Sequence, residues 1–279
     1  MRQIETIAEM KAACRGTTRE GKMLGLVPTM GALHEGHLSL VRAAAAECDA
    51  VAASLFVNPL QFGPTEDFEK YPRSLERDAE MLETAGATLL FVPSIAEMYP
   101  PGATTYVEVS DLSTKLDGGS RPGHFRGVAT VVSKLFEIVR PDRAYFGQKD
   151  AAQVALLRKM VRDLDMDVEI VVCPIVREPD GLAMSSRNAY LNPEQRRQAL
   201  ALSRSLREVK SAVGAGEHDA QKLVAIGTRF IAAEPGAKLD YFVVVDPDTL
   251  EAVKNVSQGT LVAVAAWVGT TRLIDNLVL

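Results

Sequence analysis

Short apolar runs alternate with amphipathic stretches over the first two-thirds of the chain. The apolar runs have the length of buried strands, and they cover residues 23–27, 51–57, 89–92, 143–146 and 168–172. Between them, apolar residues recur at helical spacing over residues 38–48, 75–85, 128–139 and 151–164. Strands that alternate with helices imply right-handed crossovers and parallel pairing. The pattern predicts an α/β fold, a Rossmann-like parallel sheet with helices on both faces.

The last third of the chain has a different pattern. Asn192 and Pro193 are typical of a helix start, and helical spacing continues from there to about residue 213. A second helix is predicted over residues 220–232, followed by three strands at residues 239–245, 261–268 and 272–277. Because closely spaced strands favour antiparallel pairing, we expect a smaller C-terminal α+β domain. The predicted boundary separates residues 1–175 from residues 176–279.

Composition narrows the class of protein. The chain has 279 residues and is 47% hydrophobic and 24% charged, as is usual for a globular protein. A formal net charge of −5 argues against a broad nucleic-acid-binding surface. Three cysteines without paired spacing, and an N-terminus without an apolar signal core, favour a cytoplasmic location. The longest apolar stretch, near residues 260–268, is too short to cross a membrane.

Residues 28–40, Pro-Thr-Met-Gly-Ala-Leu-His-Glu-Gly-His-Leu-Ser-Leu, follow the first predicted strand and open a predicted helix. His34 and His37 are three residues apart and therefore lie on one helical face. The unpaired N–H groups at a helix N-terminus suit phosphate, and two imidazoles there can donate to phosphate oxygens as charge builds in a transition state. Gly36 leaves room for a base or a sugar to approach. The segment is typical of a nucleotide site.

Two other interpretations apply to these histidines. A single histidine at a helix start is usually a cap or a solvated residue. A zinc site is disfavoured, because the zincin helix places its histidines four apart with a glutamate as base, and a catalytic zinc needs a third protein ligand. The remaining histidines and the three cysteines are widely spaced. We therefore expect no protein-bound metal site.

Further polar residues follow other predicted strands. Asn58 and Gln61 offer neutral amides, which suit a substrate with hydroxyl groups. Lys149 can bind phosphate as a point charge, and Asp150 can hold a ribose hydroxyl or hydrated Mg²⁺. Ligands of open parallel sheets bind at the carboxyl ends of the strands, so one cleft is expected to collect His34, Asn58 and Lys149. Taken singly, each motif is also compatible with an ordinary turn or a solvated cap.

A polar loop at the predicted domain junction contains two hydroxyls and a guanidinium, Ser185, Ser186 and Arg187. Such a set can clamp phosphate, since arginine binds it in a bidentate manner. The glycine-rich basic residues 118–127 either close over an anionic substrate or stiffen a domain edge, and the sequence does not decide between the two.

Five stretches together, residues 28–37, 56–63, 121–135, 147–153 and 184–188, resemble the pantoate–β-alanine ligase family over essentially the full length. Residues 34–37 look like the His-Ile-Gly-His element of the nucleotidyltransferase superfamily, which includes class I aminoacyl-tRNA synthetases. Residues 184–187 look like a shortened Lys-Met-Ser-Lys-Ser loop. The resemblance implies that pantoate and ATP, with Mg²⁺, form pantoyl adenylate and pyrophosphate. β-Alanine then attacks the adenylate, giving pantothenate and AMP.

The resemblance also implies roles for individual residues. Residues 1–175 are expected to form the nucleotide- and pantoate-binding domain, and residues 176–279 a smaller lid domain. The protein is expected to be a homodimer. Catalytic roles fall on His37, the expected proton donor, and on His34, Lys149 and Arg187. Gln61, Gln153 and Asn58 are expected to bind pantoate, and Gln61 also β-alanine. The expected ATP-binding residues are Met30, Gly31, Ala32, Leu33, His34, Glu35, Gly36, His37, Gly147, Gln148, Lys149, Asp150, Val176, Met184, Ser185, Ser186 and Arg187.

Three rival functions remain open at this level. Another nucleotidyltransferase would share the two histidines, but it would need a basic pocket for a substrate phosphate where this chain has neutral amides. An aminoacyl-tRNA ligase is disfavoured by the acidic charge and by the lack of an evident RNA-binding appendage. A non-catalytic nucleotide sensor would bind ATP without releasing pyrophosphate.

Overall fold

The computed structural model describes residues 1–63, 68–69 and 71–279. It divides into two compact units: Met1–Gly147 with Leu156–Cys173, and Gln148–Ala155 with Pro174–Leu279. Within the described ranges, no helix is both long enough and apolar enough to cross a membrane.

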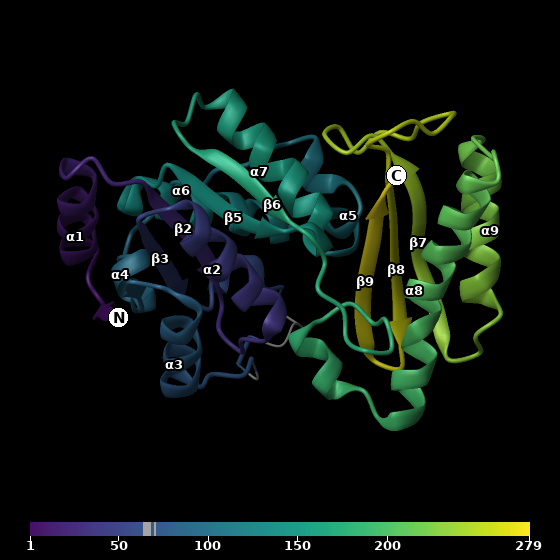
Figure 1. Cartoon of the computed structure of the whole chain (residues 1–279), viewed down its shortest axis with the longest axis horizontal. Coiled ribbons are helices and arrows are strands. Elements are labelled where there is room, and N and C mark those ends of the chain that lie inside the picture. Colours follow the sequence, from purple (N-terminus) through teal and green to yellow (C-terminus); the bar gives the residue numbers. More distant parts are fainter. Residues whose placement is uncertain (64–67, 70) are drawn as a thin grey trace. The chain divides into compact units, whose positions relative to one another are not determined.

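The first unit is built on a parallel sheet (Figure 1). Among the described residues, its six strands are ordered β1-β4-β3-β2-β5-β6, and every neighbouring pair is parallel. Their bounds are β1 Arg2–Ile4, β2 Leu24–Thr29, β3 Ala50–Leu55, β4 Leu89–Phe91, β5 Arg143–Gly147 and β6 Glu169–Cys173. From β2 the chain first builds outward through β3 to β4 and later returns to add β5 on the other side. The switch point, where ligands of such sheets bind, therefore lies between β2 and β5.

Helices cover both faces of this sheet. Leu26 and Val27 are consecutive in β2 and both fully buried, which requires a covering layer on each side because neighbouring strand residues point to opposite faces. Helix α2 packs with α3, and α1 packs with α6. The helices of this unit are α1 Ile7–Arg19, α2 Glu35–Glu47, α3 Leu75–Ala85, α4 Ile95–Met98, α5 Asp117–Ser120 and α6 His124–Val139, with 3₁₀ turns η1 Pro59–Gln61 and η2 Leu112–Thr114.

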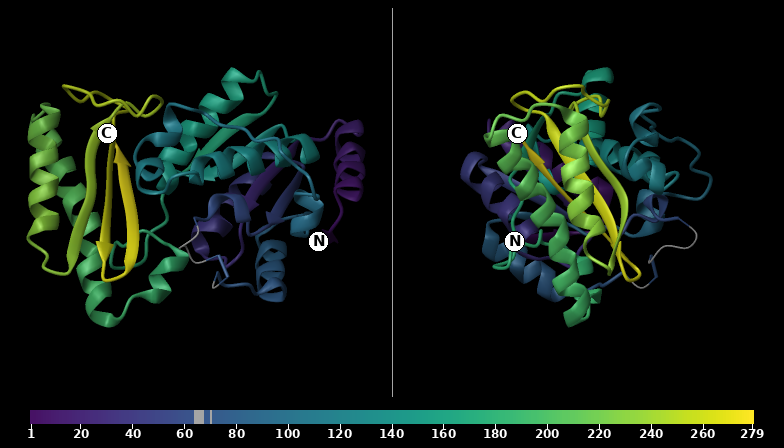
Figure 2. Two further views of the ribbon diagram at one scale, coloured as in Figure 1. Left: turned by 180° about the vertical axis from the view of Figure 1, so that it is seen from behind. Right: turned by 90° about the vertical axis from the view of Figure 1, so that its right-hand side faces the viewer.

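The second unit has an antiparallel sheet with two helices side by side on one face (Figures 1 and 2). Its strand order in the described chain is β7-β8-β9, with β7 Ala237–Val245, β8 Leu261–Val268 and β9 Thr271–Val278. The helices are α8 Pro193–Gly214 and α9 Ala220–Ala232. One core joins them, formed by Val262, Val264 and Ala266 of β8 with Leu202 and Leu206 of α8.

The connection between the units carries several predicted site residues. The 3₁₀ turn η3 Gln148–Asp150 follows β5 directly and leads into α7 Ala151–Asp163, which begins in the second unit and ends in the first. A later 3₁₀ helix, η4 Ser186–Tyr190, precedes α8. The predicted fold class is confirmed: a Rossmann-like parallel sheet is followed by a smaller α+β part.

The sequence pattern did not predict two N-terminal elements. Strand β1 has only three residues, two of them exposed, so it shows no alternation to detect. Helix α1 buries just Met10 and Cys14, and so narrow an apolar stripe is a weak helical signal.

Candidate functional site

The two histidines close the first turn of α2 with their own side chains. His34 is the N-cap, and its Nδ1 accepts the Gly36 N–H at 3.1 Å. In the opposite direction, His37 Nδ1 accepts the His34 N–H at 3.4 Å. The rings lie against each other with centroids 4.1 Å apart. The helix therefore begins at Glu35, three residues before the predicted Leu38, because imidazole nitrogens here take the place of the usual capping oxygens.

These bonds select one tautomer for each ring. An imidazole nitrogen that accepts a backbone N–H carries no proton itself, so the neutral ring holds its proton on Nε2. His34 and His37 can thus both act as N–H donors through Nε2 at the positive end of α2. Paired donors at a helix N-terminus suit oxygens that carry negative charge.

A buried carboxylate holds the loop that leads to these histidines. Asp78 of α3 is 1% exposed, and its two oxygens accept the N–H groups of Ala32 at 2.9 Å and Leu33 at 3.1 Å. Gly31 and Ala32 have positive φ, 87° and 51°, and a Cβ on Gly31 would lie 3.1 Å from Asp78 Oδ2. Asp78 therefore stabilises an uncommon backbone conformation. Sequence reasoning missed Asp78. The one feature that could have pointed to it is its position, since this acidic residue lies on the same helical face as the buried apolar residues of α3.

Asn58 follows β3 as the N-cap of η1, is 1% exposed and forms hydrogen bonds through both polar atoms of its side chain. Its Nδ2 donates to Gln61 Oε1 and to the Gly127 carbonyl, each at 3.0 Å. Its Oδ1 accepts the Leu60 N–H at 3.3 Å and the Tyr99 hydroxyl at 2.9 Å. The described contacts therefore show Asn58 holding Gln61 in one orientation.

Tyr99 completes this hydrogen-bond network. Burial raises the pKa of the Tyr99 hydroxyl above its ordinary value, so the group remains protonated near neutral pH. It can therefore remain a donor to Asn58. The sequence offered no signal for Tyr99, which lies 41 residues from its partner.

Gln61 links the residues expected to bind pantoate with those expected to bind ATP. Its Nε2 contacts the Met30 sulfur at 2.9 Å. A thioether is a weak acceptor, so a substrate oxygen is a better partner for this N–H. The Gln61 carbonyl accepts from His124 Nδ1 at 2.8 Å, and Arg121 contacts His124 Nε2 at 3.0 Å. The glycine-rich basic segment therefore contacts the Gln61 turn through Arg121 and His124.

In the second unit, Lys149 and Asp150 belong to the turn η3. Lys149 Nζ lies 4.0 Å from Asp150 Oδ1, and their side chains are 21% and 50% exposed. Both groups are thus accessible in this unit. Gln153, also expected to bind pantoate, lies in the first turn of α7.

The segment of Val176 and Met184 forms a small hairpin. The Met184 N–H donates to the Val176 carbonyl at 3.0 Å, and Arg177 pairs with Ala183 as an antiparallel bridge. Beyond the hairpin, Ser185 caps η4 by accepting the Arg187 N–H at 3.3 Å. Val176 and Met184–Arg187, which are separate in sequence, are therefore brought together.

Charged side chains fix the far end of this hairpin. Arg196 of α8 contacts both Glu178 and Asp180, each at 2.7 Å. The hydrogen bond from Arg196 holds the pKa of Glu178 below its usual value. Glu178 also accepts from Asn188 at 2.7 Å, so this carboxylate connects the hairpin to the segment after Arg187.

Across the described residues, no group of three or more His, Cys, Asp or Glu side chains could hold a metal ion. This finding is compatible with Mg²⁺ that arrives with a nucleotide, because protein-bound Mg²⁺ commonly uses one or two carboxylates together with substrate phosphates and water. Asp150 is half exposed beside Lys149 and supplies a suitable carboxylate.

The fold and these residue sets define an α/β enzyme of the Rossmann-like class. Comparison with known proteins gives the family: the sequence model of pantoate-beta-alanine ligase matches residues 2–278, and the chain belongs to this family. It is a ligase that joins pantoate to β-alanine through an amide bond.

Relatives of similar length support the assignment. The chain is 63% identical to the pantothenate synthetase of Acidobacterium capsulatum, covering 100% of this chain and 97% of the relative. It is 58% identical to that of Thermotoga neapolitana, with 100% of both chains covered. Among solved structures, pantothenate synthetase from Thermus thermophilus matches with a TM-score of 0.94 at 48% identity, over 99% of each chain.

A solved structure with ligands matches at lower identity. The pantoate-beta-alanine ligase of Francisella tularensis, complexed with β-γ ATP and β-alanine, matches with a TM-score of 0.80 at 33% identity. The match covers 100% of this chain and 97% of that one.

Proposed function

We propose that the chain works in two steps through pantoyl adenylate. The pantoate carboxylate attacks the α-phosphorus of ATP, an acyl–phosphate bond forms, and pyrophosphate leaves. The amine of β-alanine then attacks the acyl carbon, loses a proton, and expels AMP. The Francisella relative complexed with β-γ ATP and β-alanine supports this proposal, because the first step uses ATP and the second uses β-alanine.

The histidine pair carries the proposal. His34 and His37 each turn Nδ1 to a backbone N–H and so hold Nε2–H as a donor. We assign both to the phosphates of ATP, where they stabilise the charge that develops as pyrophosphate leaves. His37 serves as the proton donor. The surrounding ATP-binding residues on this side are Met30, Gly31, Ala32, Leu33, Glu35 and Gly36.

Pantoate is assigned to the amides. Gln61 binds its hydroxyls and carboxylate together with Gln153, and Gln61 also lies near incoming β-alanine. The weak bond from Gln61 Nε2 to the Met30 sulfur supports this role, because a substrate oxygen replaces it favourably. Asn58 borders the same pocket and orients Gln61 through its amide.

The second unit supplies the remaining ATP contacts. Lys149 and Arg187 act as catalytic cations on the phosphates, and Asp150 binds ribose or the hydrated Mg²⁺ that accompanies ATP. A point charge and a planar guanidinium suit these roles. The other assigned residues are Gly147, Gln148, Val176, Met184, Ser185 and Ser186.

The first test of the proposal is ATP–pyrophosphate exchange with Mg²⁺ and pantoate, in the absence of β-alanine. We expect exchange that depends on pantoate, because the adenylate forms before the amine is needed. Bound ATP without any exchange would contradict an independent first step. Omitting Mg²⁺ in the same assay tests the metal requirement.

The role of His37 has its own test. We expect His37→Ala to lower the exchange rate by about 10²–10³, the effect of losing one transition-state donor. The matched control is His218→Ala, which removes an exposed histidine of the second unit and should exchange at the normal rate. A His37→Ala variant that exchanges at the wild-type rate would remove His37 from the mechanism.

We further infer that the protein is a cytoplasmic homodimer and that residues 1–175 and 176–279 are its domains. Membership of the family supports the dimer, and the three unpaired cysteines support a reducing compartment. Sedimentation equilibrium at micromolar concentration tests the dimer, and a species of 30.2 kDa would contradict it.

A further inference from the structure

Strand β9 places two polar residues in the interior of the second unit. Asp275 and Asn276 are consecutive, and each is only 2% exposed. Since neighbouring strand residues point to opposite faces, one of these two side chains lies on each face of the sheet. Asp275 lies across from Val264, a residue of the helix-covered core. Buried polar groups are costly without partners. The partners of Asn276 are Gln148 and Lys149, both assigned to ATP, and the partner of Asp275 is Arg177, which follows Val176.

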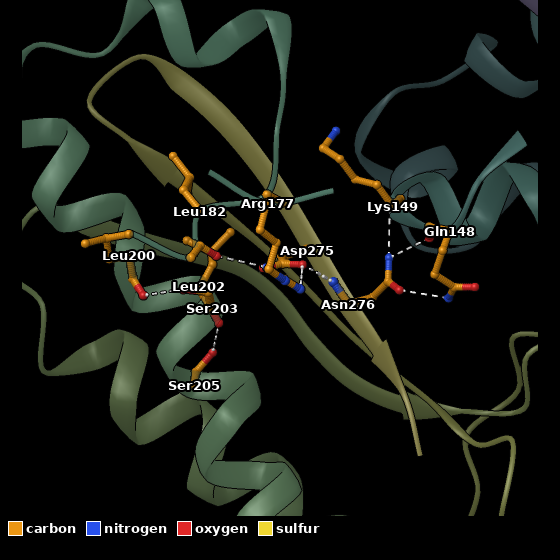
Figure 3. Close-up of polar contacts among 12 residues, drawn as sticks. Gln148, Lys149, Arg177, Leu182, Leu200, Leu202, Ser203, Ser205, Asp275 and Asn276 are labelled. Atoms are coloured by element: carbon orange, nitrogen blue, oxygen red, sulfur yellow. Dashed lines mark hydrogen bonds and ion pairs between the residues drawn. The ribbon is translucent and has the colours of Figure 1, made fainter. Parts of the chain in front are cut away.

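Asn276 holds the turn that carries Lys149 (Figure 3). Its Nδ2 donates to the carbonyls of Gln148 and Lys149, each at 2.9 Å. Its Oδ1 accepts from Gln148 Nε2, also at 2.9 Å. One amide thus uses both donor hydrogens and its oxygen on two consecutive residues, which fixes the backbone at the base of the Lys149 side chain.

Asp275 holds the hairpin on the other face. Arg177 binds it in a bidentate manner, with Nη1–Oδ2 at 2.7 Å and Nη2–Oδ1 at 2.9 Å (Figure 3). The same guanidinium donates to the Gly181 carbonyl at 3.1 Å. Asp275 Oδ1 also accepts the backbone N–H of Asn276 at 2.8 Å, so the carboxylate also holds the backbone of its neighbour.

The position of the Lys149 ammonium depends on hydrogen bonds that hold the backbone of this residue. Its ammonium ends a flexible four-carbon stem and, unlike arginine, has no preorganised fork. Holding its backbone therefore restricts the region that the ammonium can reach. Placement errors near 1 Å can reduce a reaction rate by about 100-fold.

We infer that Asn276, buttressed by Asp275, is a positioning residue for the adenylation step and acts through Lys149. The inference rests on the proposed role of Lys149 at the ATP phosphates. Neither β9 residue is assigned to a substrate here. Their function is to hold η3 and the Val176 hairpin on opposite faces of a single strand.

A double-mutant cycle tests the inference on the full-length protein. We would measure kcat/KM for ATP in pyrophosphate exchange for wild type, Asn276→Ala, Lys149→Ala and the double variant. Asn276→Ala should lower kcat/KM by about 10–100-fold in the wild-type background, from misplacement of the lysine. In the Lys149→Ala background the same change should cost less than about twofold, because coupled residues are not additive.

Two further variants separate positioning from stability. Asn276→Asp keeps the shape and the acceptor for Gln148 but loses both N–H donors, so it should show the same kinetic loss while remaining folded by near-ultraviolet circular dichroism. Arg272→Ala is the matched control, since it removes an ion pair with Asp240 at 2.9 Å from the same face of β9. It should lower the melting temperature and leave kcat/KM within about twofold.

The outcomes that overturn the inference are distinct. Equal losses from Asn276→Ala in both backgrounds would show an effect independent of Lys149. Near wild-type kcat/KM in Asn276→Asp would show that the two donors are dispensable. If Lys149→Ala retains full activity, the proposed role of Lys149 fails and this inference fails with it. If Lys149→Ala is impaired while the Asn276 variants are not, the inference alone fails.

Discussion

At the scale of single residues, several buried polar side chains hold the backbone around the site residues. Asp78 holds the loop before His34, and Asn276 holds the turn of Lys149. Asn58 binds both a carbonyl and the Gln61 amide. Such groups preorganise the residues assigned to ATP and pantoate, so their removal should affect catalysis more than the loss of an exposed charge outside the assigned residues.

Asp78 offers a direct prediction at this scale. Asp78→Asn keeps the shape but replaces one acceptor oxygen with an NH₂ group, which cannot accept the Ala32 or Leu33 N–H. Because one buried N–H is then left unsatisfied, we expect about 1–3 kcal/mol of lost stability. We also expect a lower kcat in pyrophosphate exchange, by about 10–100-fold, as the histidines move.

The control is Glu80→Gln, which neutralises an exposed carboxylate of the same helix. It should change stability by no more than about 0.5 kcal/mol and leave exchange intact. If both variants exchange equally well, Asp78 has no part in positioning the histidine loop.

At the scale of elements, the contact between α6 and η1 positions the Gln61 turn. Gly127 lies in α6, and a Cβ there would be 2.2 Å from the Leu60 carbonyl oxygen and 2.6 Å from the Gln61 nitrogen. These are backbone atoms, so they cannot swing away as a side chain can. The close approach of helix and turn therefore requires glycine at this position.

We expect Gly127→Ala to push η1 away from α6. Overpacking should cost about 1–3 kcal/mol of stability, and the KM for pantoate should rise because Gln61 is displaced. Urea unfolding and steady-state kinetics measure the two effects.

Gly16→Ala is the matched control in α1. Its Cβ would meet nothing within 4 Å, so the substitution should stabilise the helix by up to about 1 kcal/mol and leave the pantoate KM unchanged. An unaltered pantoate KM in Gly127→Ala would show that the α6–η1 contact does not position Gln61.

At the scale of the whole molecule, each unit has its own hydrophobic core. The first unit buries Val41, Leu82 and Leu90 in one cluster, and the second buries Leu206 and Val264 in another. Trp267, the single tryptophan of the sequence, lies in β8 and reports on the second unit.

We expect Leu206→Ala to lower the free energy of unfolding reported by Trp267 fluorescence by about 2–5 kcal/mol. The reason is that a 2% exposed leucine leaves a cavity when it is truncated. Val278→Ala, at a 47% exposed position of the same unit, should cost no more than about 0.5 kcal/mol. Equal effects of the two substitutions would contradict the assigned core.

The sequence by itself determined the order and type of most elements and the family. Helices α3 and α9 and strand β8 begin and end where the sequence pattern predicts. The two helices bury residues at helical spacing, and β8 is a short, almost continuously buried apolar run. The motifs around His34, Asn58, Lys149 and Arg187 stand out in sequence because each is a local run of unusual composition. Their roles at the substrates stay predictions.

Only the tertiary structure decided which residues support those motifs. Asp78 reaches Ala32 across 46 positions, and Asn276 reaches Lys149 across 127. A strand or helix pattern says which face is buried, but it says nothing of which distant carbonyl or N–H a buried polar group will meet. That choice depends on how the strands are ordered and on which segments pack together, because a hydrogen bond forms only between groups in direct contact.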